Sequence, residues 1–285
     1  MIIKNKYIFL AISAILVIAS VVALAVFGLK EGIDFIGGTQ WEMKGVKYET
    51  IRSVLPKDAT ITAGGSQSFI VRLPELSESD HQKYLKLIKE KNPVLVELSF
   101  ETIRSSIGQE LKKKAIWAFL LVLLGISLYI AFAFRRVSRP VSSWKYGIIT
   151  LLTLFHDALI PAGLMALLGW LYGAEVGINF IVAILVVMGF SVHDTIVVFD
   201  RIRENIQLEK NSNSGFAELV NKSVLQTFAR SINTSLTLVL VLLALYFLGA
   251  DSLRNFILII LVGVVVGTYS SIFVASPLLV LAEKK

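Results

Sequence analysis

The chain has 285 residues, of which 55% are hydrophobic and 17% are charged, with a mean hydropathy of +0.72 and a net charge of +7. A soluble domain carries roughly 25% charged residues, so this composition excludes an ordinary soluble protein and indicates helices that span a bilayer. The absence of cysteine excludes disulfides, thiolate metal sites and a cysteine nucleophile. The positive charges flank apolar segments and do not alternate with aromatic residues, which indicates membrane orientation and not nucleic-acid binding.

The first apolar segment covers residues 7–29 and follows Lys4 and Lys6. It is long enough to cross a hydrocarbon core of about 30 Å. The sequence Ala-Leu-Ala at 23–25 resembles a signal-peptide cleavage site, so a cleaved leader is an alternative. The segment exceeds the roughly 7–15 apolar residues of a signal peptide, which favours a retained span over residues 1–29.

Residues 30–114 are charged, mixed in sign and patterned with short periods, which predicts one folded domain. Ser77 followed by Asp80 is typical of a helix start, and Asn92-Pro93 of a helix end. Glycines in residues 64–67 predict a hairpin turn. The predicted strands are 39–44, 60–63, 69–73 and 94–100, and the predicted helices are 48–55 and 77–91. The order β-α-β-β-α-β indicates an α+β domain of the ferredoxin-like type.

Five further apolar segments follow within residues 115–285, approximately at 115–134, 147–171, 176–199, 232–248 and 256–281. The connections at about 135–146 and 200–231 and the C-terminal end are rich in Lys and Arg. By the positive-inside rule these connections and both termini are cytoplasmic, which places the domain of residues 30–114 outside the cytoplasm. Lys112–Lys114 are basic on the outer side, but they end a long loop, where the rule is weak.

Three other features of the sequence lead to structural predictions. The polar segment 204–228, with a break at 211–215, predicts a cytoplasmic hairpin or a pair of interfacial helices, either as a solvated connector or as a docking site. Gly189, Gly263 and Gly267 fit close helix packing, because small residues allow helices to approach. The sequence Ser276-Pro277 predicts a kink in the last span.

Ionisable residues inside the apolar segments are the candidate functional groups. They are His156 and Asp157 in the third span, His193 and Asp194 in the fourth, and Arg230 at the start of the fifth. Such a group at the centre of a helix costs roughly 2.5–3.5 kcal/mol on insertion scales, so it is expected to face a partner and to mark an ion pathway. An ion pair between Asp194 and Arg230 is reasonable for neighbouring helices, with Thr234 one turn beyond Arg230.

Two interpretations of these groups remain open. Asp194, Arg230 and Thr234 form a proton relay, or they only fix helix packing. His156, Asp157 and His193 are either relay groups or intramembrane polar support, and His193 points about 100° away from Asp194. A metal-dependent intramembrane hydrolase is a weaker alternative, since adjacent helical residues diverge from a common ion. The sequence predicts no metal and no cofactor.

Four stretches resemble the SecF family of bacterial protein-export membrane subunits. They are residues 189–204 (GFSVHDTIVVFDRIRE), 32–39 (GIDFIGGT), 155–157 (FHD) and 230–235 (RSINTS). The likeness covers the whole chain in order, including one large loop after the first span. Many family members have Asn at the position of His193. In this chain His193 therefore adds a second titratable group beside Asp194.

The resemblance implies a six-span bundle of the RND type that pairs with a larger homologous subunit, SecD. It implies assistance to the SecYEG channel, association with YajC and YidC, and use of the proton motive force to promote late steps of preprotein translocation. It assigns proton transfer to Asp194, Arg230 and Thr234, and a structural role to Gly32, Asp34, Gly37 and Gly38. The rival hypotheses are an RND-type exporter of small molecules or lipids and a purely structural scaffold. Sodium as coupling ion, the stoichiometry with SecD and the preprotein-contacting surface stay open.

Overall fold

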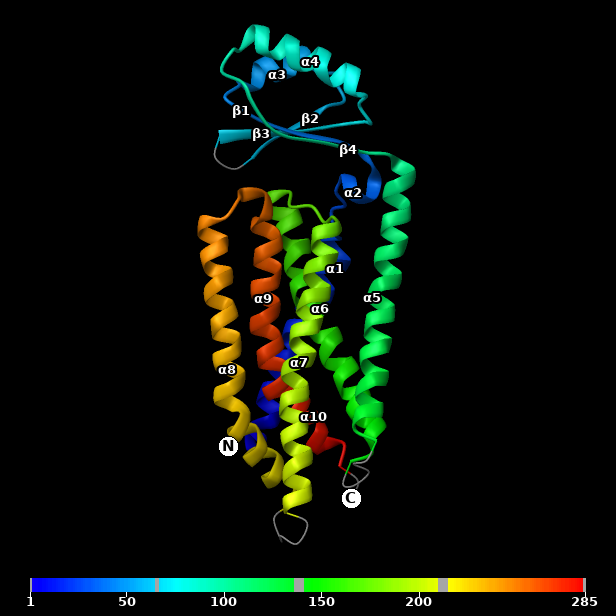
Figure 1. Cartoon of the computed structure of the whole chain (residues 1–285), viewed down its shortest axis with the longest axis vertical. Coiled ribbons are helices and arrows are strands. Elements are labelled where there is room, and N and C mark those ends of the chain that lie inside the picture. Colours follow the sequence, from blue (N-terminus) through cyan, green and yellow to red (C-terminus); the bar gives the residue numbers. More distant parts are fainter. Residues whose placement is uncertain (1, 65–66, 136–140, 210–214, 284–285) are drawn as a thin grey trace. The chain divides into compact units, whose positions relative to one another are not determined.

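The computed structural model describes residues 2–64, 67–135, 141–209 and 215–283 (Figure 1). The chain divides into two compact units. The helical unit comprises Met1–Lys30 and Trp117–Lys285, and the α/β unit comprises Glu31–Ile116. Each unit has its own hydrophobic core.

Six helices in the described residues are long and apolar enough to cross a membrane, as the sequence predicts. Five of them are α1 (Lys6–Phe27), α5 (Ser105–Ala133), α6 (Ser143–Tyr172), α7 (Ile178–Leu208) and α8 (Phe216–Leu248). The sixth is composite and consists of α9 (Arg254–Ser270), a π-helical turn η4 (Ser271–Ala275) and α10 (Ser276–Leu281). Short 3₁₀ turns, Ile3–Asn5 and Asp251–Leu253, precede α1 and α9.

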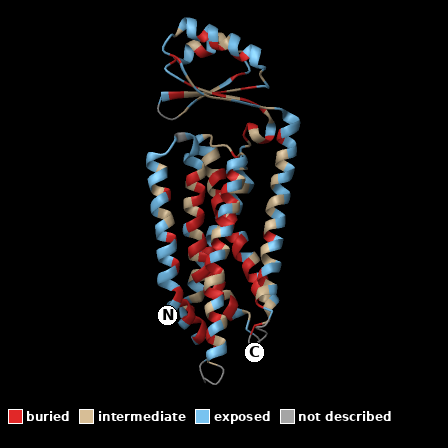
Figure 2. Ribbon diagram, in the orientation of Figure 1, coloured by how far each residue is buried: buried red, intermediate tan, exposed pale blue. Residues whose placement is uncertain are grey.

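Helix α9, the first part of the composite span, is the centre of the helical unit. It packs against α6, α7 and α8, while α1 packs against α6. Figure 2 shows buried residues concentrated on α6, α7 and α9, and mostly exposed residues on α5 and α8. The inner helices therefore carry the protected positions at which a buried polar group can be held.

The polar segment 204–228 is helical on both sides of the predicted break, as the hairpin alternative requires, but the helices are not a separate interfacial pair. The described part of it continues the spans, since α7 extends to Leu208 and α8 begins at Phe216. Asn205 of α7 donates to Ser223 Oγ at 2.8 Å and to Gln226 Oε1 at 2.9 Å on α8. These bonds hold the two polar extensions together over buried apolar residues. Residues 211–214 of the predicted break lie outside the described residues.

The irregularity of the last span lies one turn before Pro277, at the π-helical turn η4. A proline cannot donate to the carbonyl four residues earlier, and its ring crowds that carbonyl. A widened turn relieves this crowding, and Ser276 Oγ donates to the Ser271 carbonyl at 3.2 Å. Because π-turns within α-helices are frequent at functional sites, η4 marks its neighbourhood as a candidate functional site.

The α/β unit has the predicted β-α-β-β-α-β order. Its elements are β1 (Gly38–Lys44), α3 (Tyr48–Val54), β2 (Thr60–Ala63), β3 (Ser68–Leu73), α4 (Glu78–Lys91) and β4 (Val96–Ile103), preceded by the short helix α2 (Ile33–Ile36). The strands form an antiparallel sheet in the order β2-β3-β1-β4. This is the ferredoxin-like arrangement that the sequence predicts.

Side chains at alternate positions of the strands point to the same face of the sheet and form the core of this unit. Trp41 and Met43 of β1 and Val71 of β3 are fully buried together with Ile51 of α3 and Ile88 of α4. The predicted cap of α4 is present, because Ser77 Oγ accepts from the Asp80 N–H at 3.2 Å.

The fourth strand lies slightly further along the chain than predicted. The Leu95 N–H donates to the Asn92 carbonyl at 3.1 Å, so a turn occupies the first predicted strand residues. Pairing with β1 then continues as far as Ile103 opposite Gly38. The strand prediction of 94–100 is therefore corrected to Val96–Ile103.

Candidate functional site

Asp194 lies in the middle of α7 on the face turned toward the composite helix. Ser191, Asp194, Thr195 and Val198 are all buried, and their spacing of three and four residues defines that face. The side chain of Asp194 is 5% exposed. Its Oδ2 accepts a hydrogen bond from Ser271 Oγ, at the first position of η4. The structure thus places a carboxyl group between apolar helices with a hydroxyl as its partner.

Asp157 of α6 is the second buried carboxyl group and has no exposed surface. Its Oδ2 accepts from Ser191 Oγ of α7 and from Ser270 Oγ of α9, the latter at 2.7 Å. Its Oδ1 lies 2.8 Å from Nδ1 of His156. Three helices therefore supply groups to one carboxylate, which compensates part of the cost of its burial.

His156 has one bonded and one unbonded ring nitrogen. The side chain is 6% exposed. Nδ1 contacts Asp157, whereas Nε2 is buried and has no hydrogen-bond partner among the residues that the structure describes. A buried nitrogen without a partner costs roughly 1–3 kcal/mol, so its retention calls for an explanation.

The two carboxyl groups are linked through consecutive residues, Ser270 and Ser271, here called the serine pair. Ser270 donates to Asp157 and Ser271 donates to Asp194. On α7, Ser191 at the level of Asp157 precedes Asp194 by three residues, a rise of roughly 4.5 Å. Asp157 and Asp194 thus occupy successive levels along the axis of the bundle.

Glycines bring α9 close enough to α7 for these contacts. A Cβ on Gly263 would lie 2.2 Å from Val187 Cγ2, and one on Gly267 would lie 3.0 Å from Ser191 Cβ. The prediction of close packing is confirmed for these two. It is not confirmed for Gly189, which is exposed and would place a Cβ in open space within this chain.

Arg230, Thr234 and His193 are exposed on the surface of the helical unit. The described residues contain no ion pair between Asp194 and Arg230, and the structure does not bring the three predicted relay residues together. On α8 the inward positions belong to Ser231 and Ser235, and Ser235 Oγ lies 2.5 Å from Thr268 Oγ1. The relay roles of Arg230 and Thr234 stay predictions.

The serines are the site residues that sequence reasoning did not single out. Ser191 lies inside the recognised stretch 189–204, and Ser270 and Ser271 form a doublet within an apolar span. A signal was present, because hydroxyl groups in an apolar helix must find a partner inside the bundle. Their partners are on other helices, however, and helix pairing cannot be read from one helix.

The segment Gly32–Thr39 shapes the entry into the α/β unit. Gly37 ends α2 with φ +79°, and a Cβ there would lie 2.5 Å from Ser105 Cα. A Cβ on Gly38 would lie 2.8 Å from the Leu73 carbonyl oxygen. Both positions therefore require glycine, which supports the structural role predicted for this segment.

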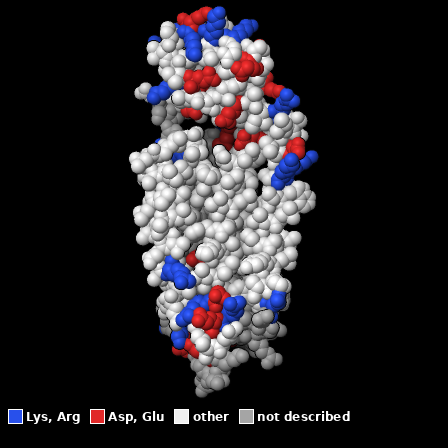
Figure 3. Space-filling view, viewed as in Figure 1, with Lys and Arg blue, Asp and Glu red and all other residues white. Residues whose placement is uncertain are grey.

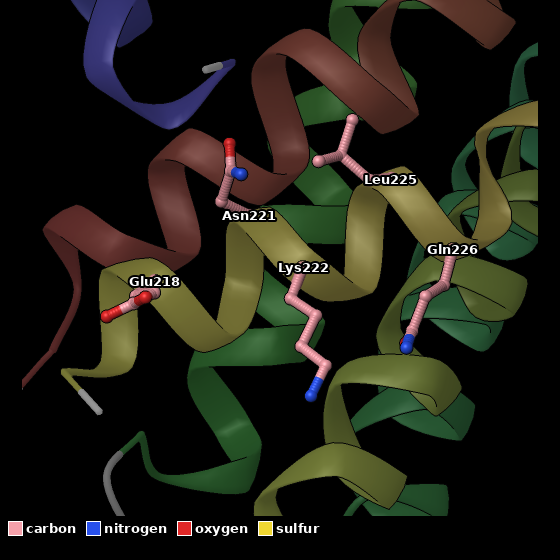
Figure 4. Close-up of a pocket in the computed structure, with 5 residues that line it drawn as sticks. All are labelled: Glu218, Asn221, Lys222, Leu225 and Gln226. Carbon is pink, nitrogen blue, oxygen red and sulfur yellow. The ribbon is translucent and has the colours of Figure 1, made fainter. Parts of the chain in front are cut away.

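One surface pocket is lined by α8 alone, by Glu218, Asn221, Lys222, Leu225 and Gln226 (Figure 4). Its polar groups serve neighbouring elements, since Lys222 Nζ lies 2.5 Å from Glu209 Oε1 and Asn221 Oδ1 accepts from the Ile3 N–H at 3.4 Å. Across the described part of the chain, no three His, Asp or Glu side chains are grouped as a metal site would require. The buried carboxyl groups remain the candidate site.

Comparison with family models gives two matches. Residues 83–285 match the model described as protein export membrane protein SecD/SecF, C-terminal. Residues 22–44 match the model described as the SecD/SecF GG motif, which includes Gly37 and Gly38.

Curated relatives match along the full chain. The protein translocase subunit SecF of Thermobaculum terrenum is 43% identical, with 100% of this chain and 94% of that protein covered. The SecF subunit of Anaerolinea thermophila is 36% identical, with 99% and 94% covered. The subunit SecDF of Thermus thermophilus is 40% identical, with 94% of this chain but only 37% of that longer protein covered.

Solved structures agree with these matches. The crystal structure of SecDF from Thermus thermophilus, described as a translocon-associated membrane protein, superposes with a TM-score of 0.84 at 38% identity. The match covers 98% of this chain and 38% of that one. A structure of SecDF in a super-membrane-facing form gives a TM-score of 0.70 at 37% identity. The chain therefore belongs to the SecD/SecF family of protein-export membrane proteins.

Proposed function

We propose that this chain is a subunit of the Sec protein-export machinery that, together with SecD, uses the proton motive force to promote late steps of preprotein translocation. It acts as an ion-gradient-coupled subunit and not as an enzyme. It lies in the bacterial cytoplasmic (inner) membrane with both termini in the cytoplasm. Its further partners are the SecYEG channel, YajC, YidC and the exported preprotein.

Pairing with SecD is supported by the fused relative. This chain matches 37% of the SecDF subunit of Thermus thermophilus, which carries both names in one polypeptide.

Arg230, Thr234 and His193 are polar or charged but exposed in spans that lipid would surround. Polar groups in spans normally face protein, so a partner's helices are expected to cover this side of α7 and α8.

The observation that carries the proton-coupling proposal is the buried Asp194. Its carboxyl group is enclosed by helices, and its bonded partner is the neutral hydroxyl of Ser271. A carboxyl group held by a neutral donor can exist in either protonation state without breaking an ion pair inside the bundle. One proton crossing about 100 mV releases about 2.3 kcal/mol, enough to bias two conformations that differ by a few kcal/mol.

The distribution of charge supports the proposed orientation. The start of α1, the end of α10, the end of α7 and the start of α8 lie at the same end of the helical unit (Figure 1). On the face shown in Figure 3, the charged side chains of the helical unit gather toward that end, and the middle of the unit is largely uncharged. Arg201, Arg203 and Lys222 belong to this end, which the positive-inside rule places in the cytoplasm.

The test uses inverted membrane vesicles that contain the chain with its SecD partner. Export of a preprotein is measured with and without a proton gradient for the wild type and for Asp194→Asn. We expect the variant to lose the stimulation by the gradient while keeping the gradient-independent export. The control is Asp200→Asn, an exposed residue of the same helix that pairs with Arg203 at 2.5 Å. Equal stimulation in the wild type and in Asp194→Asn would exclude proton coupling through Asp194.

A further inference from the structure

The pair His156–Asp157 is a second enclosed ionisable group of the helical unit, in addition to Asp194. Asp157 has no exposed surface, and three groups on three helices bond to its carboxylate. A purely structural polar contact between helices needs one donor and one acceptor. Here the carboxylate collects three hydrogen-bonding partners, and His156 keeps a buried Nε2 that has none among the described residues. That surplus of proton-binding atoms distinguishes the cluster from simple helix packing.

Each hydroxyl of the serine pair has two possible hydrogen-bond acceptors, a carboxylate oxygen and a backbone carbonyl oxygen. Ser270 Oγ donates to Asp157 Oδ2 at 2.7 Å and also lies 3.0 Å from the Gly267 carbonyl oxygen. Ser271 Oγ donates to Asp194 Oδ2 and lies 3.0 Å from the Thr268 carbonyl oxygen. Each hydroxyl has a single proton, so it serves the carboxylate or the backbone carbonyl, but not both fully. Which acceptor it serves depends on whether the carboxyl group is ionised.

The serine pair also lies at a structural junction. Ser270 is the last residue of α9, and Ser271 is the first residue of the π-helical turn η4. The Ser271 carbonyl accepts from Ser276 Oγ, which is five residues further on. The backbone hydrogen bonding of the helix therefore changes pattern at the two residues that contact the two carboxyl groups.

We propose that Asp157, with His156, is a second proton-binding site of this bundle, coupled to Asp194 through Ser270 and Ser271. When a proton binds at Asp157 Oδ2, that oxygen becomes a donor, and at least one of the two serine hydroxyls that served it must turn away. Ser270 turns to the Gly267 carbonyl, and the backbone at the junction adjusts. The change reaches Ser271, the adjacent residue, and through its hydroxyl the carboxyl group of Asp194.

Few other ionisable groups compete with this coupling. Besides His156, the helices packed against Asp157 bring Asp194 and His193 from α7, Tyr269 from α9, and Tyr146 and Tyr7 from more distant turns of α6 and α1. His193 is exposed, and the hydroxyl of Tyr269 donates to the Phe9 carbonyl at 2.9 Å. Of these groups, Asp194 is joined to Asp157 through adjacent bonded residues.

The inference deepens the proposed function and rests on it for its purpose, but its test reads protonation and not export. The complex of the chain with SecD is labelled with ¹³C-aspartate, and infrared difference spectra are recorded across a pH titration. The carboxylic-acid C=O band reports each aspartate that gains a proton. We expect two bands from the spans, one lost in Asp157→Asn and the other in Asp194→Asn. We also expect the titration midpoint of the Asp194 band to change in Asp157→Asn.

Ser270→Ala keeps both carboxyl groups and tests the coupling without removing a titrating residue. We expect it to shift the frequency of the Asp157 band and the midpoint of the Asp194 band. The control is Ser127→Ala in α5, whose hydroxyl donates to the Leu123 carbonyl of its own helix, and which should change neither. Thermal unfolding establishes that each variant is folded.

Two results would overturn the inference. One is an Asp157→Asn spectrum that superposes on that of the wild type, which would show that Asp157 keeps one protonation state throughout. The other is an Asp194 midpoint unchanged in both Asp157→Asn and Ser270→Ala, which would show two independent sites. If export in Asp194→Asn is normal, the proposed function fails instead, whereas the Asp157 band still decides this inference.

Discussion

Asp194 accepts a hydrogen bond from Ser271, and this contact joins the middle of α7 to the π-helical turn of the last span. The sequence suggested Arg230 as the partner of Asp194, but the structure exposes Arg230 on the surface of α8. The partner of Asp194 within the described residues is thus a neutral hydroxyl.

Gly163 sets the distance between α1 and α6. A Cβ at this position would lie 2.5 Å from both Cα and Cβ of Ser20, and backbone atoms cannot rotate away. We expect Gly163→Ala to force the two helices apart and to destabilise the helical unit by about 1–3 kcal/mol. Thermal unfolding in detergent measures this loss.

Gly125→Ala in α5 is the matched control for Gly163→Ala. Nothing lies within 4 Å of the added Cβ at Gly125. The substitution should be neutral or slightly stabilising, because alanine has the higher helix propensity. An equal loss of stability in both variants would contradict the assignment of the α1–α6 contact to Gly163.

Gly37→Ala tests the glycine pair at the entry to the α/β unit. Gly37 has φ +79° and ψ 174°, a conformation that costs other residues about 1–3 kcal/mol, and its Cβ would also clash with Ser105. Gly28 has nearly the same dihedral angles, φ +67° and ψ 176°, but open space around it. We expect Gly37→Ala to lower the midpoint of chemical unfolding more than Gly28→Ala does. The reverse order would refute the role of the Ser105 contact.

Thr39→Val should destabilise the α/β unit. Thr39 is fully buried, and its Oγ1 accepts from the Leu76 N–H at 2.9 Å and bonds Thr102 Oγ1 at 2.9 Å. Valine keeps the shape but leaves the Leu76 N–H without an acceptor, which costs about 1–3 kcal/mol. Hydrogen exchange of the β1 amides measures the loss. Thr62→Val removes one longer bond, of 3.3 Å to the Ile70 carbonyl, and should have a smaller effect.

The start of α4 should contribute a small dependence of stability on pH. Hydrogen bonds from Gln82 and then from His81 lower the pKa of Glu78 below its ordinary value of 4.5. A group with a lowered pKa in the folded state stabilises it above the unfolded value and loses that contribution as the pH falls through the folded value. The protection of the α4 amides, measured relative to their intrinsic exchange rates, should therefore fall as the pH falls below about 4.5, and less so in Glu78→Gln.

Gln82→Ala checks the cause of that effect. Gln82 Nε2 donates to Glu78 Oε1 at 2.7 Å, so its removal should raise the pKa of Glu78 toward the ordinary value. The loss of protection in acid should then be weaker, as in Glu78→Gln. An unaltered acid response in both variants would assign it to other groups.

The number of spans and the order of the α/β elements were predictable from local patterns. Apolar length identifies a span, and the cap at Ser77 marks the start of α4, because both depend on neighbours in sequence. The polar segments 204–208 and 216–228 were predicted as a hairpin or a helix pair, but not as continuations of α7 and α8, since the bonds of Asn205 that hold them reach across to another helix. The polar composition of these segments did not reveal that one face of each helix carries buried apolar residues.

For the site, the sequence identified the carboxyl groups but not their partners. Asp157 and Asp194 are conspicuous as charges in apolar spans, whereas Ser191 and Ser270 are small hydroxyl residues that a span tolerates almost anywhere. Only the packing of α9 between α6 and α7 brings Ser270 to Asp157 and Ser271 to Asp194. The exposure of Arg230 could not be inferred either, because it depends on which face of α8 meets α9.

Proton flux through the purified pair of this chain and SecD in liposomes tests the central claim most directly. A pH-sensitive dye inside the vesicles reports proton entry when a gradient is imposed, with sodium present or absent. The account predicts sodium-independent flux in the wild type and in the exposed-residue variant Asp200→Asn, and its loss in Asp194→Asn. Equal flux in the wild type and Asp194→Asn, or flux that requires sodium, would contradict it.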